Sequence, residues 1–188
     1  MTGTRAPRRD ARDNAAKLRS AAMELFLAKG LDASLYEIAK GAGVSIGTLY
    51  NHFGSREGLI DAVIPGVVGT RLQELAASAT SQPTPRARLE SFVHGMFSLL
   101  RDDPALNDSV LRRYPEASAL LDICATSTDL GRTLVREAHA DGSLSPNFTE
   151  DDLVSLLWLA GTGGREQSAP PGWRRILERA LSSAWTAP

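Results

Sequence analysis

Apolar residues recur along the chain at spacings of three and four between turn signals, which is the pattern of amphipathic α-helices. No stretch shows the sustained alternation of apolar and polar residues that marks a half-buried strand. The sequence therefore predicts an all-α protein. The expected helices cover residues 14–29, 35–40, 46–52, 56–79, 85–100, 104–113, 115–140, 152–159 and 173–183.

Serine, glycine and proline residues mark the ends of these helices. Ser45 and Ser55 can each cap a helix that follows, and Gly30 stands where a left-handed C-cap belongs. Pro65 lies inside the fourth pattern and removes a backbone amide, so we expect a kink or break there. The segment 161–172 is rich in glycine and proline and predicts a loop.

The second and third predicted helices are short and are separated by about four residues that include Gly43. A longer helix precedes them and can support both with its apolar face. This is the helix-turn-helix arrangement, in which the second helix can enter a DNA major groove. Ala39 allows the two helices to approach closely, while Val44 and Leu49 can fix their angle. The same arrangement also occurs as ordinary packing in helical proteins, so the pattern alone leaves both interpretations open.

Charge is distributed unevenly along the chain. The net charge is −1, but residues 1–60 hold nine Lys and Arg against six Asp and Glu, and the remainder is acidic. This asymmetry is expected where only one end meets phosphate, although a solvated face and a loose tail also explain it. Four arginines, Arg5, Arg8, Arg9 and Arg12, precede the first predicted helix. Such an arm either enters a minor groove or stays mobile.

More detailed evidence comes from residues 35–53, Leu-Tyr-Glu-Ile-Ala-Lys-Gly-Ala-Gly-Val-Ser-Ile-Gly-Thr-Leu-Tyr-Asn-His-Phe, followed by Ser55-Arg56-Glu57 and Leu59. This stretch resembles the DNA-binding signature of TetR-family transcriptional regulators, and the resemblance extends over residues 14–62. It implies a flexible basic arm (1–13), a helix-turn-helix DNA-binding domain (14–55) and a helical bundle for ligand binding and dimerisation (56–188).

The resemblance also implies roles for single residues. It implies that Thr48, Tyr50 and His52 contact the DNA backbone. The residues expected against the groove are Ser45, Ile46, Gly47 and Asn51, while Tyr36 and Arg56 approach from the neighbouring helices. Position 46 often carries lysine or another polar residue in such proteins, so Ile46 predicts an apolar contact instead.

A single helix-turn-helix binds one half-site weakly, so we expect a homodimer on a palindromic double-stranded operator. In resembling proteins the last two helices pack against their copies as a four-helix bundle. The candidate interface residues are Leu153, Leu156, Leu157, Leu159, Ala160, Ile176, Leu177, Ala180, Leu181 and Trp185. Some of them must belong to the ordinary core.

The middle helices are expected to enclose a pocket for an unknown small-molecule effector. Candidate apolar or amphipathic lining residues are Phe92, Met96, Phe97, Tyr114, Leu121, Cys124 and Trp158, and His94 and Asn107 can supply polar groups. For each residue taken singly, core packing is the alternative role. The function expected is that of a ligand-responsive repressor, with an activator of the same fold or an all-helical enzyme as alternatives.

Composition and short motifs exclude several other classes of protein. The single cysteine, Cys124, excludes a disulfide scaffold, and the basic N-terminus is no secretory signal, so we expect a soluble cytoplasmic protein. The apolar run 153–164 is too short for a membrane span. Three histidines without a spaced ligand set predict no metal. The chain has no nucleophile elbow, and Gly161-Thr-Gly-Gly lacks the Lys-Ser/Thr of a phosphate loop, so we expect no cofactor and no enzyme activity.

Overall fold

The computed structural model describes residues 6–111, 114–166 and 168–186. Within them the chain forms helices and one isolated antiparallel bridge, between Leu144 and Trp185. The helices are α1 (Ala6–Lys29), α2 (Leu35–Gly41), α3 (Ile46–Phe53), α4 (Arg56–Thr80), α5 (Pro85–Asp102), α6 (Pro104–Val110), α7 (Ser118–Ala140), α8 (Glu150–Arg165) and α9 (Trp173–Ser183). The all-α prediction is confirmed.

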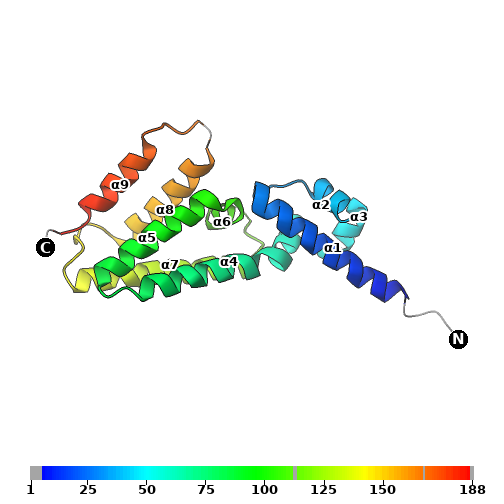
Figure 1. The fold of residues 1–188 in the computed structure, drawn as a ribbon, viewed down its shortest axis with the longest axis horizontal. Coiled ribbons are helices and arrows are strands. Elements are labelled where there is room, and N and C mark those ends of the chain that lie inside the picture. The colour runs from blue at the N-terminus through cyan, green and yellow to red at the C-terminus, as the bar shows by residue number, and fades with distance from the viewer. Residues whose placement is uncertain (1–5, 112–113, 167, 187–188) are drawn as a thin grey trace.

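The molecule has two parts. In Figure 1, α1–α3 form a small group at one end, which we call the head, and α4–α9 form an elongated group, which we call the body. Helix α4 begins beside the head and runs into the body, while α6 lies at the body end that faces α1. No helix in the described part of the chain has the length and hydropathy needed to cross a bilayer.

Side-chain caps explain where several helices begin. The Oγ atoms of Ser45 and Ser55 accept the backbone amides three residues further on, at 3.1 and 3.0 Å. Thr149 and Asp152 form a reciprocal capping box at the start of α8. Gly30 has φ +88°, as its predicted C-cap role requires. These boundaries were therefore predictable from local sequence.

Several predicted helix limits are wrong. Helix α1 begins at Ala6 and so includes part of the predicted arm, α6 ends at Val110, and α7 begins at Ser118. Helix α4 is continuous through Pro65, so the chain does not break there. Buried side chains on both sides of that proline, Val63, Ile64 and Val68, hold the helix in place.

Helix α8 continues into the segment predicted as a loop and ends at Arg165. Its glycines are sites of close packing. A Cβ at Gly163 would lie 2.8 Å from the Trp173 ring, at the start of α9. Glycine usually destabilises a helix, but at position 163 it lets α9 approach α8 closely.

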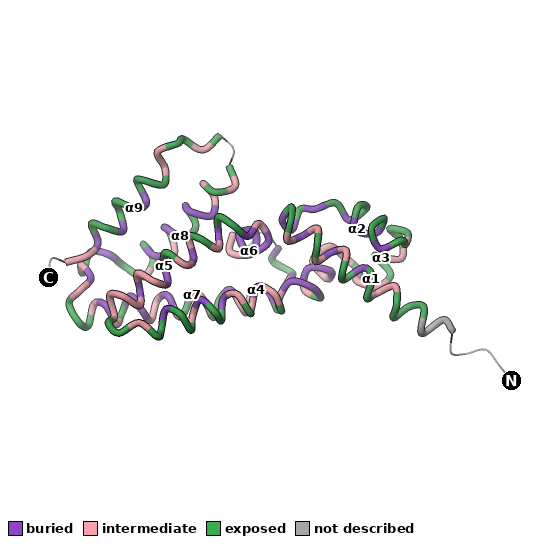
Figure 2. The backbone as a smooth tube through the Cα atoms, in the orientation of Figure 1, coloured by how far each residue is buried: buried purple, intermediate pink, exposed green. Residues whose placement is uncertain are grey.

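One continuous hydrophobic core runs through head and body. Leu18, Phe26 and Leu49 are fully buried in the head, and Leu59 and Leu106 are fully buried in α4 and α6. Figure 2 shows the buried backbone on the inward faces of the helices. The head is therefore packed against the body rather than attached by a loose linker.

Candidate functional site

Helix α3 is held rigidly and presents one face outward. Gly43 has φ +70° in the turn before it, a conformation that favours glycine. Leu49 is fully buried, and Ala39 of α2 is buried where the two helices meet. The packing role predicted for Ala39 and Leu49 is confirmed, and α2, the turn and α3 form a helix-turn-helix.

The outward face of α3 consists of uncharged side chains. Tyr50 is 48% exposed and Ile46 36% exposed, and Gly47 and Asn51 are exposed beside them. Tyr36 on α2 is 67% exposed, the largest value among the big apolar and aromatic side chains described. Three large apolar or aromatic side chains are thus exposed on adjacent helices, and a patch of this kind marks an interaction surface.

Polar groups in and beside α3 lie near this face: Ser45, the N-cap, is exposed, and Thr48 and His52 are half-buried. The hydroxyls of Ser45 and Thr48 share a hydrogen bond of 2.9 Å. The His52 ring packs against Phe53 at a centroid distance of 6.1 Å. Both Thr48 and His52 keep part of their surface accessible. All nine predicted DNA-contact residues, Arg56 included, are thus at least partly exposed in or next to α3.

Arg56, the ninth predicted residue, is used inside the protein. Its Nη1 donates to the backbone oxygens of Leu31 and Ala33, at 2.8 and 2.7 Å. A guanidinium engaged in this way supports the loop between α1 and α2. We therefore leave Arg56 out of the DNA-contact set.

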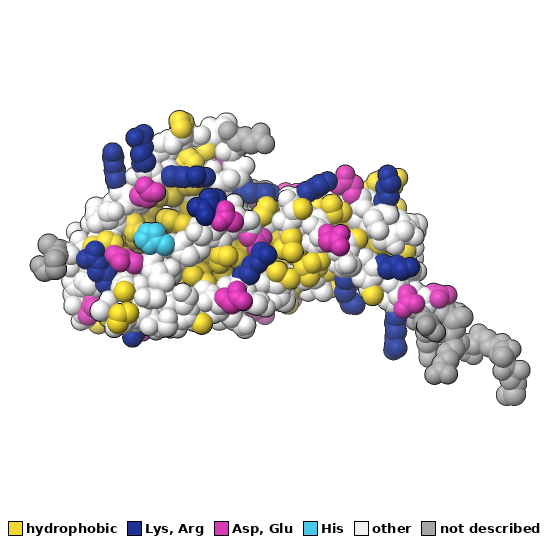
Figure 3. Space-filling view, viewed as in Figure 1, with side chains coloured by type: hydrophobic (Ala, Val, Ile, Leu, Met, Phe, Trp, Pro, Cys, Tyr) yellow, Lys and Arg dark blue, Asp and Glu magenta, His cyan; other side chains and the backbone are white. Residues whose placement is uncertain are grey.

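Basic side chains project from several sides of the head, with acidic side chains among them (Figure 3). Arg12, Arg19 and Lys40 are exposed, and Arg19 lies 5.7 Å from the centre of the Phe53 ring. Arg5 of the predicted arm lies outside the described residues, as do the side chains of Arg8 and Arg9. The described head therefore carries cations near α3 but not on its outward face.

A loop at residues 30–34, which we call the junction loop, connects the head to the body. Asp108 of α6 is fully buried, and its Oδ2 accepts from the Leu31 amide at 2.8 Å and from Arg165 of α8 at 3.2 Å. A Cβ at Gly30 would lie only 2.5 Å from this carboxylate oxygen. A larger residue here would displace this carboxylate, and the positive φ of Gly30 also favours glycine. The sequence pattern had no signal for this contact.

A second polar contact holds the same loop. The Tyr114 hydroxyl donates to Asp32 at 2.5 Å. Burial, together with the Asp32 carboxylate, raises the pKa of Tyr114 well above its usual range. With Arg56 from α4, the junction loop is therefore held by three separate parts of the body.

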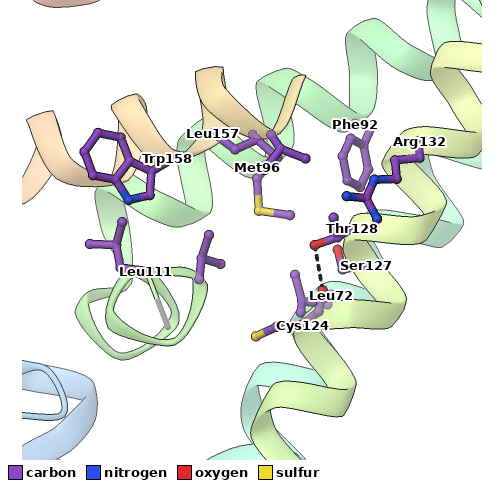
Figure 4. A pocket seen from close by; sticks show the side chains of 12 residues that line it. Leu72, Phe92, Met96, Leu111, Cys124, Ser127, Thr128, Arg132, Leu157 and Trp158 are labelled. Atoms are coloured by element: carbon purple, nitrogen blue, oxygen red, sulfur yellow. Dashed lines mark hydrogen bonds between the residues drawn. The ribbon is translucent and has the colours of Figure 1, made fainter. Parts of the chain in front are cut away.

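The body encloses a cavity of about 370 Å³ among α4, α5, α7 and α8 and the end of α6 (Figure 4). Its lining residues are Leu72, Phe92, Met96, Val110, Leu111, Cys124, Ser127, Thr128, Arg132, Val154, Leu157 and Trp158. The volume falls within the usual range of about 300–1,000 Å³ for small-molecule sites. Two grooves of similar volume lie elsewhere and are more open.

Four of the nine predicted pocket residues line this cavity: Phe92, Met96, Cys124 and Trp158. The other five predicted residues do not line it. They are His94, Phe97, Asn107, Tyr114 and Leu121.

Other interactions account for most of these five positions. His94 is exposed and bonds the Glu90 carbonyl at 2.8 Å through Nδ1. Phe97 lines a separate, smaller pocket of about 110 Å³ beside α9. Asn107 is fully buried and donates to the carbonyls of Leu100 and Gly161, at 2.7 and 3.0 Å. It joins α6 to α5 and α8 instead of facing a ligand.

Sequence reasoning missed the polar side of the cavity. Thr128 and Arg132 follow Cys124 on α7 at intervals of four residues, so all three share one face of the helix. That spacing was a usable signal once Cys124 was placed inward. In the described part of the chain, no three His, Cys, Asp or Glu residues are grouped to hold a metal ion.

Most predicted interface residues are buried within the chain itself. The prediction that they form a contact surface is wrong for these six, which pack in the core: Leu153, Leu156, Leu157, Ala160, Leu177 and Leu181. Trp185 is half-buried, with the Arg86 guanidinium 5.0 Å from its ring centre.

The remaining three predicted residues, Leu159, Ile176 and Ala180, lie on the surface. Ile176 is 66% exposed and Ala180 is exposed one turn further along α9. Leu159 of α8 is 47% exposed and lines a groove with Ala180. An apolar strip therefore follows α8 and α9.

Comparison with known proteins agrees with this arrangement. The family model described as "Bacterial regulatory proteins, tetR family" matches residues 18–63. The HTH-type transcriptional regulator UidR of Escherichia coli strain K12 is 29% identical over 195 residues, covering 93% of this chain and 96% of that protein. The regulatory protein RaaS of Mycobacterium tuberculosis is 37% identical over 91 residues, which cover 46% of this chain and 43% of that protein.

The fold is also found among solved structures. The transcriptional regulator FadR of Bacillus subtilis, solved in complex with stearoyl-CoA, superposes with a TM-score of 0.60 at 19% identity. The superposition covers 89% of this chain and 97% of that one. At this identity the likeness shows the fold alone, so the site must be judged from its own residues.

Proposed function

Since this chain is a DNA-binding transcriptional regulator of the TetR family, we propose that it acts as a dimeric repressor released from its operator by a small molecule. It acts by binding and not by catalysis, in the cytoplasm, on a palindromic site. The observation that carries the proposal is the exposed, uncharged face of α3, held in place by the Ser45 cap and the buried Leu49.

The chemistry of this face suits the major groove. Asn51 can pair with an adenine edge, and Ile46 can contact a thymine methyl group. The hydroxyls of Thr48 and Tyr50 can donate to phosphate oxygens and set the orientation of α3. Because Gly47 has no side chain, the backbone can come close to the duplex.

A second copy provides the second half-site. The apolar strip at Leu159, Ile176 and Ala180 is exposed in one copy and would be covered by the same strip of another. Pairing there leaves both heads free at the opposite end of the body. Two α3 helices can then enter successive major grooves on one side of the DNA.

The cavity and the head are connected through shared helices. Val110 and Leu111, at the end of α6, line the cavity, and Asp108 lies on the same helix. Trp158 lines the cavity from α8, which also carries Arg165. A ligand that moves α6 or α8 therefore acts on Asp108, which binds the junction loop, or on Arg165, which binds Asp108. It needs to prefer one head position by only a few kcal/mol to shift the population.

Selection of bound duplexes from a random DNA pool tests this function. The full chain should enrich an inverted repeat, and its affinity should fall steeply with salt because phosphate contacts release counterions. A chain carrying Tyr50→Ala should lose the enrichment, whereas an exposed substitution in the body, Arg101→Gln, should keep it. The proposal fails if the folded parent chain enriches no sequence at moderate salt.

A further inference from the structure

The wall of the body cavity is chemically divided. Its polar side chains, Ser127, Thr128 and Arg132, all come from α7, and Figure 4 shows them gathered on one side. The opposite side in that view carries Trp158 and Leu111, with Met96 between. A ligand that fits both sides must have one polar end and an apolar remainder.

Arg132 has unused hydrogen-bonding capacity on the polar side. Its only hydrogen bond among the described residues is a long one, from Nη1 to Asp129 at 3.4 Å. Its Nε lies 4.0 Å from Glu150 Oε2, and the other oxygen of Glu150 accepts from Arg136 at 3.0 Å. Two arginines therefore share one carboxylate, and Arg132 is the more weakly held. Its planar guanidinium retains donors suited to a two-oxygen anion.

The rest of the cavity wall indicates the sign and the size of the charge that the ligand carries. No Asp or Glu is among the lining residues described, so nothing there favours a cationic ligand. Arg132 is the one cationic lining residue, which fits a single negative charge better than a dianionic phosphate. The hydroxyls of Ser127 and Thr128 provide further polar contacts at the same end.

Position and volume fit a ligand with its charged end near water. The Arg132 side chain is 39% exposed, so an anion beside it keeps part of its hydration. A cavity of about 370 Å³ lies near the lower limit for small-molecule sites. A medium-length chain or a small ring therefore fits better than a long acyl chain.

We propose that this cavity binds an amphipathic monocarboxylate, with Arg132 holding the carboxylate and the Met96–Trp158 side covering the apolar part. The assignment deepens the proposed function, because it names the chemical class of the effector. Arg132 is the residue that distinguishes the acid from the corresponding alcohol.

Calorimetric titration of the full chain with decanoate, decanol and decyltrimethylammonium tests this assignment. The parent chain should bind decanoate about tenfold or more tightly than decanol, and the cation most weakly. Arg132→Gln should weaken decanoate binding about tenfold or more while changing decanol binding less than about twofold. Arg132→Lys, which keeps the charge but loses the planar donor group, should give an intermediate loss.

Arg86→Gln is the matched control. Arg86 is 40% exposed and paired with Glu90, as Arg132 is paired with acids, but it lies outside the cavity lining. This variant should bind all three probes like the parent chain. Thermal unfolding of each variant should show that the fold is retained.

Three results would overturn the assignment. The first is equal affinity of the parent chain for decanoate and decanol. The second is an equal loss of affinity for decanoate and decanol in a folded Arg132→Gln chain. The third is tighter binding of decyltrimethylammonium than of decanoate. Selection from random DNA provides a separate readout. A chain that enriches an operator but ignores decanoate refutes the ligand class alone, whereas a chain that binds decanoate but enriches no DNA refutes the proposed function.

Discussion

Asp108→Ala should destabilise the protein by disconnecting the head from the body. The carboxylate is fully buried and accepts from the Leu31 amide and from Arg165. Removing one partner of a buried ion pair costs about 3–5 kcal/mol. Because the Arg165 side chain is 27% exposed and can regain water, we expect a loss near the lower limit, about 3 kcal/mol.

Thermal unfolding followed by circular dichroism measures this effect. For a chain of this size each kcal/mol shifts the Tm by about 2–4 °C, so Asp108→Ala should lower it by about 6–12 °C. Asp102→Ala is the control, because this exposed carboxylate pairs only with the neighbouring Arg101 among the described residues. A Tm of Asp108→Ala equal to that of the Asp102 variant would show that the junction loop is not held by this carboxylate.

Three further predictions concern other parts of the molecule. Thr48→Val combined with Tyr50→Ala should abolish sequence-specific DNA binding at an unchanged Tm, and a large fall in Tm would assign these residues to the fold instead. Ile176→Asp should shift the chain to monomers in sedimentation experiments, which an unaltered dimer would contradict. Hydrogen bonds from the Thr149 amide and hydroxyl lower the pKa of Asp152, so its stabilisation is present at neutral pH and is lost as the pH falls below its ordinary value of 3.8. Urea unfolding of Asp152→Asn should therefore show a weaker acid dependence than the parent chain, and identical pH profiles would refute this contribution.

The head could be predicted from sequence because its determinants are local. The Ser45 cap, the turn at Gly43 and the buried Leu49 lie within one short segment, where spacing alone specifies their roles. Their agreement with one another made the helix-turn-helix identifiable. The same holds for the capping box at Thr149, although α8 extends further than the pattern indicated.

The cavity and the junction depend on residues that are distant in sequence. Asp108 and Leu31 are 77 residues apart, and nothing local marks either as a partner of the other. Arg132 has the composition of a surface residue, and only its helical register with Cys124 places it inward. Phe97 and Tyr114 have the apolar or amphipathic character expected of pocket residues, but both are used in other contacts. Tertiary packing therefore decided which apolar residues face the cavity.

A hydroxyl-radical footprint on the selected duplex tests most directly whether two α3 helices read one DNA face. Two protected patches are expected, related by a two-fold axis and separated by about 10–10.5 base pairs or a multiple of this distance. Both should disappear with Tyr50→Ala. A single patch, or protection without a defined position, would contradict the claim that a symmetric pair of heads binds the operator.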